Sequence, residues 1–454
     1  AVASGRERIG PIHGISLTLI QTLLLAGLAV LTRYAAAVLA SHLTATLSAR
    51  VRADQRIALA QAYLSTSWSI QHAEPSGRLQ ELLTSFVGRV NVAVISATQS
   101  VTAGLSLLAF LGASLIIQPL ASLGVLAILA LLGAILRPMR SRIRRESAKT
   151  NKSDLAFTAT VAEFGSLPLE MHVFGVQGPI AERVRDLTET TTENQRRVQF
   201  LSGLLAPTYT LFVYVAILSA VGLLSTLATG EIASVGSVML LMLRSMTFGQ
   251  QMTTASGTIS AAVPSMRLID TTLANYRANP AGTGHLRPSS VTPIVVNDIS
   301  YAYTPDRMAL DHVSLTVAPG TATGVIGPSG AGKSSLAHLL LGLRRPDSGT
   351  VTVGGVDLAE VDRAWWTERV AFVPQQPQLF TGTVAENVRF FRPGISDDDL
   401  RRAARQANIL TEIERLPAGF DTHLGERGSQ LSGGQRQRLS IARALVGSPE
   451  LIIL

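Results

Sequence analysis

The stretch that decides the fold reads Gly-Pro-Ser-Gly-Ala-Gly-Lys-Ser at residues 327–334 and fits the pattern Gly-x-x-x-x-Gly-Lys-Ser. The apolar residues 322–326 before it predict a buried strand, and residues 335–341 after it predict a helix. This order predicts a phosphate-binding loop, because glycines let backbone N–H groups surround phosphate oxygens at a helix N-terminus. We expect Lys333 to reach the β- and γ-phosphates of a nucleotide and the Ser334 hydroxyl to bind Mg²⁺.

A second motif, Leu431-Ser-Gly-Gly-Gln435, opens another predicted helix. Ser432 is a favourable N-cap residue, and Gly433 and Gly434 let a ligand approach the backbone closely. The N-terminal end of such a helix attracts anions. The helix has a predicted packed face made of Leu439, Ala442, Leu445 and Val446. The motif therefore predicts a second anion site, and the alternative is a capped helix without a ligand.

The first part of the chain is unusually apolar. Of 454 residues, 47% are hydrophobic and 15% are charged, whereas soluble domains are about 25% charged. A membrane helix needs about 20 apolar residues. We predict an all-α polytopic membrane domain over residues 1–275, with spans at about 12–47, 90–117, 119–137, 200–228 and 234–264 and a tight turn at Gln118-Pro119. The alternative is a set of buried helices in a large soluble protein.

The basic residues give this domain an orientation. Most of those before position 200 lie in residues 48–89 and 138–199, while the connections near 118 and 224–234 carry none. The positive-inside rule places both basic stretches in the cytoplasm, as helical extensions of the spans. Arg33 is expected to snorkel toward the interface, and Arg244, deeper in the last span, is a candidate for a translocation pathway. The net charge of +8 is thus explained by membrane flanks, and no nucleic-acid partner is expected.

The second part has the texture of an α/β domain. Residues 276–293 are rich in loop-forming residues and predict a linker, and strands alternate with helices over 294–454. The chain has no cysteine, so thiol catalysis and thiolate metal sites are excluded. Its alanine-rich, lysine-poor composition is typical of a GC-rich bacterial genome.

With these motifs in order, residues 294–454 resemble the nucleotide-binding domain of ATP-binding cassette (ABC) proteins. The resemblance implies that Tyr303 stacks on adenine, with Tyr301 as second choice, although both can be ordinary strand tyrosines. It implies that Gln375, in Val373-Pro-Gln375, is the Q-loop glutamine and reaches Mg²⁺. It also implies that residues 425–428 form the x-loop, which contacts the intracellular loops; an exposed acidic turn is the alternative.

The same resemblance implies a composite site for ATP and Mg²⁺ in a head-to-tail dimer. One chain supplies Tyr303, Gly327, Pro328, Ser329, Gly330, Ala331, Gly332, Lys333, Ser334, Ser335 and Gln375. The partner chain supplies Ser432, Gly433, Gly434 and Gln435 to the γ-phosphate. Ser334 and Gln375 are the implied metal ligands.

The membrane half is similar to exporter-type ABC domains. Residues 75–79 and 161–175 fit the two intracellular loops with their short coupling helices, although Pro168 is unusual there. The family has six spans, and after the strand that ends at Leu454 it continues with the Walker B aspartate, the catalytic glutamate, the D-loop and the switch histidine. The resemblance therefore implies an internal fragment, truncated before Walker B, that does not itself hydrolyse ATP.

The implied function is ATP-driven export by a half-transporter in the cell membrane, with a cytoplasmic nucleotide-binding domain. Its implied partners are a second half-transporter, membrane lipid and an unidentified small-molecule, lipid or peptide substrate. An ATP-gated channel or regulatory ABC membrane protein is the alternative. A soluble ABC ATPase acting on nucleic acid or a protein complex is a further one, against which the apolar spans argue.

Overall fold

The computed structural model describes residues 19–117, 119–227, 232–304 and 306–454. The chain forms two compact units. The first comprises Ala1–Leu64 and Glu74–Asn275, and the second comprises Ser65–Ala73 and Tyr276–Leu454. The short segment Ser65–Ala73 therefore packs in the second unit although it joins two helices of the first in sequence.

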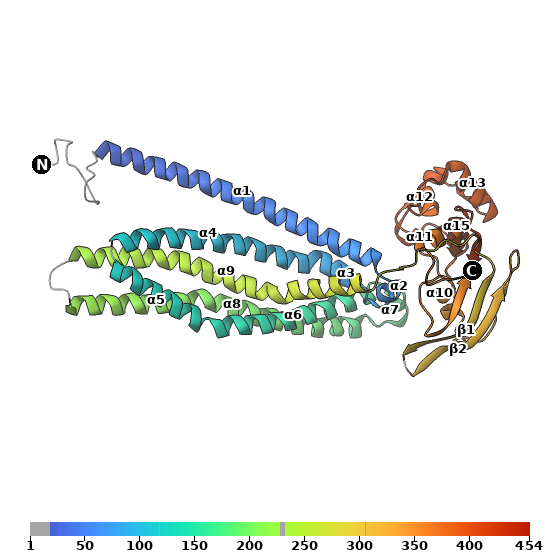
Figure 1. Ribbon diagram of the computed structural model, residues 1–454, viewed down its shortest axis with the longest axis horizontal. Helices are drawn as coiled ribbons and strands as arrows, with labels where there is room; N and C mark the ends of the chain where they lie inside the picture. The colour runs from blue at the N-terminus through green and yellow to red at the C-terminus, as the bar shows by residue number, and fades with distance from the viewer. Residues whose placement is uncertain (1–18, 118, 228–231, 305) are drawn as a thin grey trace. The chain divides into compact units, whose positions relative to one another are not determined.

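The described part of the first unit is helical, which confirms the predicted all-α class (Figure 1). Its long helices are α1 (Leu19–Ser65), α4 (Val87–Ile117), α5 (Pro119–Ile135), α6 (Arg137–Phe164), α8 (Gln177–Leu227) and α9 (Ile232–Ala278). Between them lie α3 (Arg78–Glu81), a π-helical turn at Leu82–Phe86, and α7 (Pro168–Phe174). Helix α6 ends at Phe164, and Pro168 lies in the first turn of α7. Proline costs no hydrogen bond there, because the first N–H groups of a helix have no intrahelical acceptor.

Within the described residues, three helices are long and apolar enough to cross a membrane: Leu23–Ser65, Arg78–Gly112 and Gln177–Ser219. Helix α5 also carries no charge but is 17 residues long. The prediction of five spans stays a prediction, since its turn at residue 118, parts of the first and fourth spans, and side chains at the start of the last span lie outside the described residues. The same holds for the side chain of Arg244.

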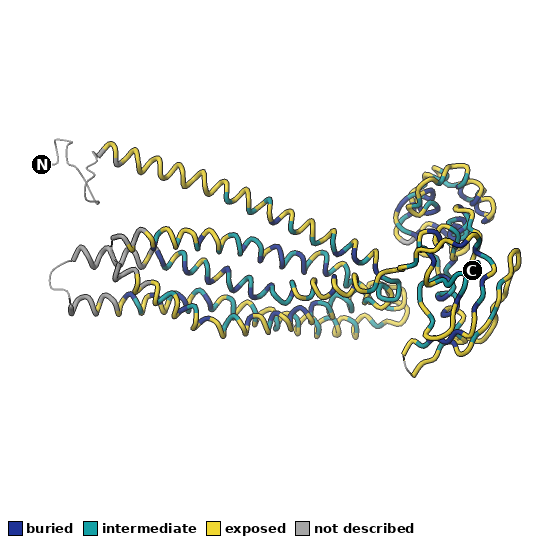
Figure 2. The backbone as a smooth tube through the Cα atoms, viewed as in Figure 1, coloured by how far each residue is buried: buried dark blue, intermediate teal, exposed yellow. Residues whose placement is uncertain are grey.

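Helix α1 is exposed along most of its length, including Arg33 (Figure 2). Leu24 and Leu31, for example, are 68% and 66% exposed. A helix with apolar side chains on every face is stable only in apolar surroundings, so this exposure suits lipid or another membrane helix.

A buried polar network ties together three helices of the first unit. The guanidinium of Arg89 on α4 pairs with Asp154 and donates to Asn151 Oδ1 at 2.6 Å, both on α6. The amide of Asn151 donates to Ser265 Oγ on α9 at 3.1 Å. Asp154, Asn151 and Ser265 are buried, so each charge and dipole depends on these partners.

The second unit contains a four-stranded antiparallel sheet in the order β2-β1-β3-β4. Its strands are β1 (Ile294–Thr304), β2 (Arg307–Val317), β3 (Ser348–Val353) and β4 (Val356–Asp357). Strand β1 is central, paired with β2 and β3. The sheet packs with α10 (Lys333–Leu340) and α11 (Arg363–Arg369) around a core that includes Ile294, Val296, Ile299, Val353 and Trp366.

The remaining strands form two small sheets. Strands β5 (Val370–Phe372) and β8 (Leu451–Ile453) pair in parallel, and β6 (Gly382–Thr383) pairs with β7 (His423–Leu424) in antiparallel. The mixture of helices and strands agrees with the predicted α/β class.

The expected buried strand at residues 322–326 is wrong. This segment has no strand assignment, and Val325 and Ile326 are 50% and 95% exposed. A parallel strand becomes buried only when neighbouring strands pair with it and helices cover both faces. Among the described residues, β5 and β8 pair with each other and not with this segment.

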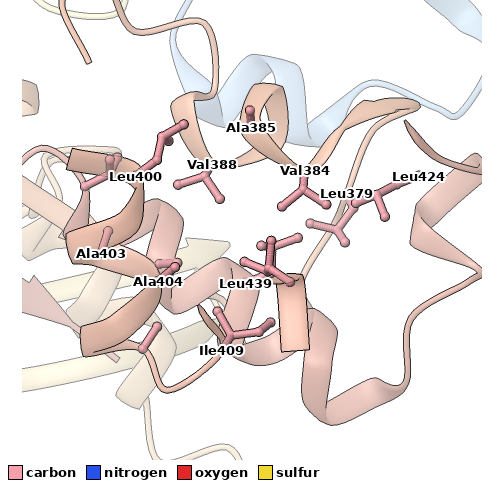
Figure 3. Packing of buried hydrophobic residues seen from close by; sticks show 14 of the residues in the cluster. Leu379, Val384, Ala385, Val388, Leu400, Ala403, Ala404, Ile409, Leu424 and Leu439 are labelled. Carbon is pink, nitrogen blue, oxygen red and sulfur yellow. The ribbon is translucent and has the colours of Figure 1, made fainter. Parts of the chain in front are cut away.

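A helical cluster surrounds the motif at residues 431–435. Its members are α12 (Val384–Arg389), α13 (Asp397–Gln406), α14 (Leu410–Glu414) and α15 (Gly433–Leu445). Figure 3 shows Val384, Val388, Leu400 and Leu439 gathered in their common core. The predicted packed face of α15 is confirmed, because Leu439, Ala442 and Val446 are buried and Leu445 packs beside them.

Two further segments concern the link between the units. Helix α9 continues to Ala278, three residues into the expected linker, and Val291 is fully buried near the other end of the linker. The helix α2 (Trp68–Ala73) belongs to the segment Ser65–Ala73 and ends just before residues 75–79, the stretch expected to form the first intracellular loop.

Candidate functional site

Helix α10 begins at Lys333, two residues before the predicted start at 335, so Lys333 and Ser334 of the phosphate-loop motif lie in its first turn. Gly330 and Gly332 both have φ of +84°, a left-handed conformation that favours glycine. A Cβ on Gly332 would lie 2.3 Å from the carbonyl oxygen of Ala309, so no larger residue fits. The ammonium of Lys333 donates to the carbonyls of Gly327 at 2.9 Å and Pro328 at 2.8 Å, which folds its side chain over the loop.

This arrangement fits the phosphates of a nucleoside triphosphate. Residues 321–331 are exposed, and a Cβ on Gly330 would meet no atom within 4 Å, so the loop is open to a ligand. The first N–H groups of a helix have no intrahelical acceptor and can bind phosphate oxygens. Lys333 could exchange its carbonyl acceptors for more strongly interacting phosphate oxygens without moving its backbone.

Tyr303 stands beside this loop. It lies near the end of β1, and its hydroxyl is 3.0 Å from Ser335 Oγ in the first turn of α10. Its side chain is 43% exposed, whereas Tyr301 is 7% exposed. The two rings touch edge to face with centroids 5.2 Å apart. Exposure therefore favours Tyr303 over Tyr301 as the residue that stacks on a base.

The two expected metal ligands are both accessible. Ser334 is exposed in α10, and Gln375 is exposed in a bend three residues after β5. In the described part of the chain, no group of three or more His, Asp or Glu side chains could hold a metal ion. Ser334 and Gln375 offer a hydroxyl and an amide oxygen, and a Mg²⁺ ion in a nucleotide site also takes ligands from the substrate phosphates.

Ser432 caps α15, as the sequence predicts. Its Oγ accepts from the N–H of Gln435 at 3.2 Å, and its own N–H donates to Gln435 Oε1 at 2.8 Å, a capping box. Gly433 and Gly434 are exposed at this end of the helix. Gln435, expected to contact the nucleotide, is used in the cap here. The helix end is thus rigid and open to an anion.

The structure brings Tyr303, Ser335 and the phosphate loop together. Ser432 and Gln435 bond to each other, at the start of α15 in the helical cluster. The expected x-loop contains a 3-10 turn at Glu426–Gly428 and packs on the segment after Gln375: a Cβ on Gly428 would lie 2.6 Å from Leu379 Cδ1.

Sequence reasoning missed one connection between these motifs. Asn387 is fully buried and holds Phe380 through two hydrogen bonds, while Arg443 of α15 donates to the carbonyls of Asn387 at 2.8 Å and Gln378 at 2.9 Å. Burial, and then the charge of Arg392, lower the pKa of Arg443 to about 10. The segment after Gln375 is thereby fastened to the helix that follows Ser432. The sequence does contain one sign of this connection, which is an asparagine between the apolar residues of α12.

Comparison with known proteins agrees with this geometry. A family profile described as ABC transporter matches residues 310–454. The fatty acid ABC transporter ATP-binding/permease protein of Mycobacterium bovis is 30% identical over 377 residues, which cover 79% of this chain and 57% of that protein. The ATP-dependent lipid A-core flippase of Desulfotalea psychrophila is 41% identical over 161 residues, which cover 36% of this chain and 28% of that protein.

The fold has a solved counterpart. A bacterial Atm1-family ABC exporter with ATP bound matches with a TM-score of 0.75 at 21% identity, over 91% of this chain and 72% of that one. The chain spans just over half the length of its Mycobacterium relative, at 57%. Its helical domain precedes the matched domain, as in exporters that fuse the two. Residues 310–454 therefore form an ABC transporter domain, and a helical membrane domain like that of exporter-type ABC proteins precedes it.

Proposed function

We propose that this chain acts as a half-transporter that exports a substrate across the cell membrane and is driven by ATP. The observation that carries the proposal is the pairing of two half-sites in one chain: an open phosphate loop at Lys333 and a capped, exposed helix end at Ser432. Each half-site is built for an anion. A second copy or a homologue, arranged head to tail, would join each phosphate loop to the other chain's helix end.

Each residue then has a defined task. Tyr303 supplies a ring face for adenine, and the loop glycines and Lys333 hold the triphosphate. Ser334 and Gln375 would hold Mg²⁺, which neutralises phosphate charge when bound. Ser432, Gly433 and Gly434 of the partner approach the γ-phosphate, so that ATP draws the two nucleotide-binding domains together and its loss releases them.

Coupling to the membrane domain would use α2 and α7. The apolar side chains of α7 are exposed, with Leu169, Val173 and Phe174 at 71%, 68% and 73%. Such a face on a seven-residue helix suits docking on a nucleotide-binding domain. Arg443 of α15 donates a hydrogen bond to the segment after Gln375. This contact supports a path by which a change at the Q-loop reaches the motif at residues 431–435.

The membrane half guides the choice of substrate. The alignment with the Mycobacterium bovis protein covers 79% of the chain and so must extend well into the helical domain. That protein is named as a fatty acid transporter, so fatty acids are the first substrates to test. The alignment with the lipid A-core flippase covers 36% of the chain and gives no comparable guide.

Transport by the full-length protein in liposomes tests the proposal. We expect ATP to drive accumulation of a fluorescent fatty acid against its gradient, and Lys333→Ala to abolish it. Flux that only dissipates a gradient, or that is equally supported by a non-hydrolysable ATP analogue, would instead indicate an ATP-gated channel.

A further inference from the structure

A cluster of rings and cations joins α2 to the strand that carries Tyr303. The indole of Trp68 stacks on His72, with centroids 4.6 Å apart and planes at 13°, and touches the ring of His338 on α10 at 4.5 Å. All three residues belong to the second unit. The sequence motifs account for none of them.

Arg344 lies at the centre of this cluster. The carbon of its guanidinium is 5.1 Å from the ring centroid of Trp68, 4.9 Å from that of Tyr303 and 5.6 Å from that of Tyr301. It also donates a hydrogen bond to the Tyr301 hydroxyl. Its Nε is buried and has no hydrogen-bond partner among the described residues, so ring faces and one hydroxyl are what hold it. A cation in contact with aromatic faces is attracted by their electron density.

The chain around Trp68 is itself anchored. The N–H of Ser67 and the hydroxyl of Thr66 both donate to the carbonyl of Asn279, at 2.7 and 2.8 Å. The N–H of Ala281 donates to the carbonyl of Ser65 at 2.9 Å. Two main-chain hydrogen bonds and a buried threonine thus fix the start of α2 beside the end of α9. A small shift of Arg344 would therefore act on α2, a helix whose start is held by hydrogen bonds.

We propose that Arg344 positions Tyr303 for the base of a bound nucleotide and links it to Trp68, so that Ser65–Ala73 responds to the base as well as to the phosphates. The inference rests on the proposed ATP site. The guanidinium lies over the ring of Tyr303, the hydroxyl of Tyr303 is held by Ser335, and the 43% exposure of the side chain leaves ring surface for adenine. Adenine, Tyr303, Arg344 and Trp68 then form one continuous set of contacts.

Nucleotide binding to the full chain in detergent tests the positioning role, with ATP and inorganic triphosphate as the two probes. Arg344→Gln should weaken ATP binding about threefold to thirtyfold, as expected for loss of a cation–π contact. Inorganic triphosphate lacks a base, so its Lys333-dependent binding should stay unchanged. The matched control is Arg345→Gln, because this neighbouring exposed arginine makes one long hydrogen bond, to Thr283 at 3.5 Å. It should leave both affinities unchanged.

Tryptophan fluorescence tests the link to α2. The chain has three tryptophans, and two of them, Trp365 and Trp366, are buried in the sheet core. Saturating ATP should change the emission of the wild type, and Trp68→Phe should remove most of that change. Saturating triphosphate should produce little change. In Arg344→Gln, the change should be lost even when ATP occupies every site.

Three results would overturn the inference. The first is an equal loss of ATP and triphosphate affinity in Arg344→Gln, which would mean that Arg344 only supports the fold of the loop. The second is an equal effect of Arg345→Gln, and the third is an unaltered fluorescence change in ATP-saturated Arg344→Gln. A wild type that binds neither probe in a Lys333-dependent way would refute the ATP site itself, and the inference with it.

Discussion

Removing the Ser432 hydroxyl separates the structural role of the motif at residues 431–435 from its proposed role in ligand binding. Ser432 and Ser396 begin two helices with the same capping box: each Oγ accepts from the N–H three residues on at 3.2 Å. Both serines are exposed. Loss of such a cap costs about 1 kcal/mol. In a domain of roughly 150–250 residues, that loss lowers the Tm by about 2–4 °C. Ser432→Ala should therefore destabilise the second unit by about this amount, and Ser396→Ala by at least as much, because the Ser396 hydroxyl also donates to Asp399 Oδ2 at 2.7 Å.

Only one of these serines faces the proposed partner nucleotide. A hydrogen bond to a charged group contributes about 1.5–3 kcal/mol, so Ser432→Ala should raise the ATP concentration needed to bring two chains together about tenfold or more. Ser396→Ala should leave it unchanged. The chain has no cysteine, so a spin label at an introduced Glu360→Cys reports the distance between two copies in nanodiscs. ATP titrations of this distance give the midpoint for each variant.

The two variants also define what would refute this reasoning. Equal midpoints in both would mean that the Ser432 hydroxyl serves α15 alone. A Tm loss in Ser432→Ala much larger than in Ser396→Ala would mean that its cap is not the ordinary one that the distances indicate.

Three other substitutions probe the phosphate loop and its surroundings. Lys333→Ala should lower ATP affinity about tenfold to a hundredfold with little change in Tm, because the hydrogen bonds of the Lys333 ammonium go to carbonyls of its own loop; a fluorescent ATP analogue measures this affinity, and an unchanged value would contradict the prediction. Gly332→Ala should abolish ATP binding, since its Cβ would lie 2.3 Å from Ala309 O. Its control, Gly355→Ala, has the same φ of +84° and open space, so it should cost only about 1–2 kcal/mol and keep ATP binding. Burial, then nearby positive charge, lowers the pKa of His338, so the unfolded chain binds this proton more readily. Stability should therefore fall as pH drops below about 6.5, the ordinary histidine pKa. Calorimetry should show a shallower fall in His338→Leu, and an unchanged fall would contradict this assignment.

The features that sequence predicted well are those fixed by local chemistry. A serine before two glycines caps a helix wherever the helix lies, and the loop before Lys333 needs its glycines because of its own backbone. The helices of the first unit follow from long apolar runs. Each of these signals is contained within a few adjacent residues.

The features that sequence could not predict depend on distant neighbours. Residues 322–326 have the composition of a buried strand, but burial requires paired strands on either side. The cluster around Arg344 joins residues from α2, β1 and α10, and nothing near Arg344 in sequence announces an aromatic partner. Gln435 has the right identity for a ligand contact, but its local partner is Ser432. Such contacts arise only once the chain has folded.

The central claim is that one ATP is held between the phosphate loop of one chain and Ser432 of another. Because the chain lacks cysteine, Ser329→Cys in one copy and Gln430→Cys, at an exposed position two residues before Ser432, in a second can be joined by a short bifunctional thiol reagent. The account predicts a cross-linked dimer that forms with ATP and disappears when Lys333→Ala is added to the first copy. No cross-link with ATP, or one that forms equally in the Lys333→Ala variant, would contradict the shared site.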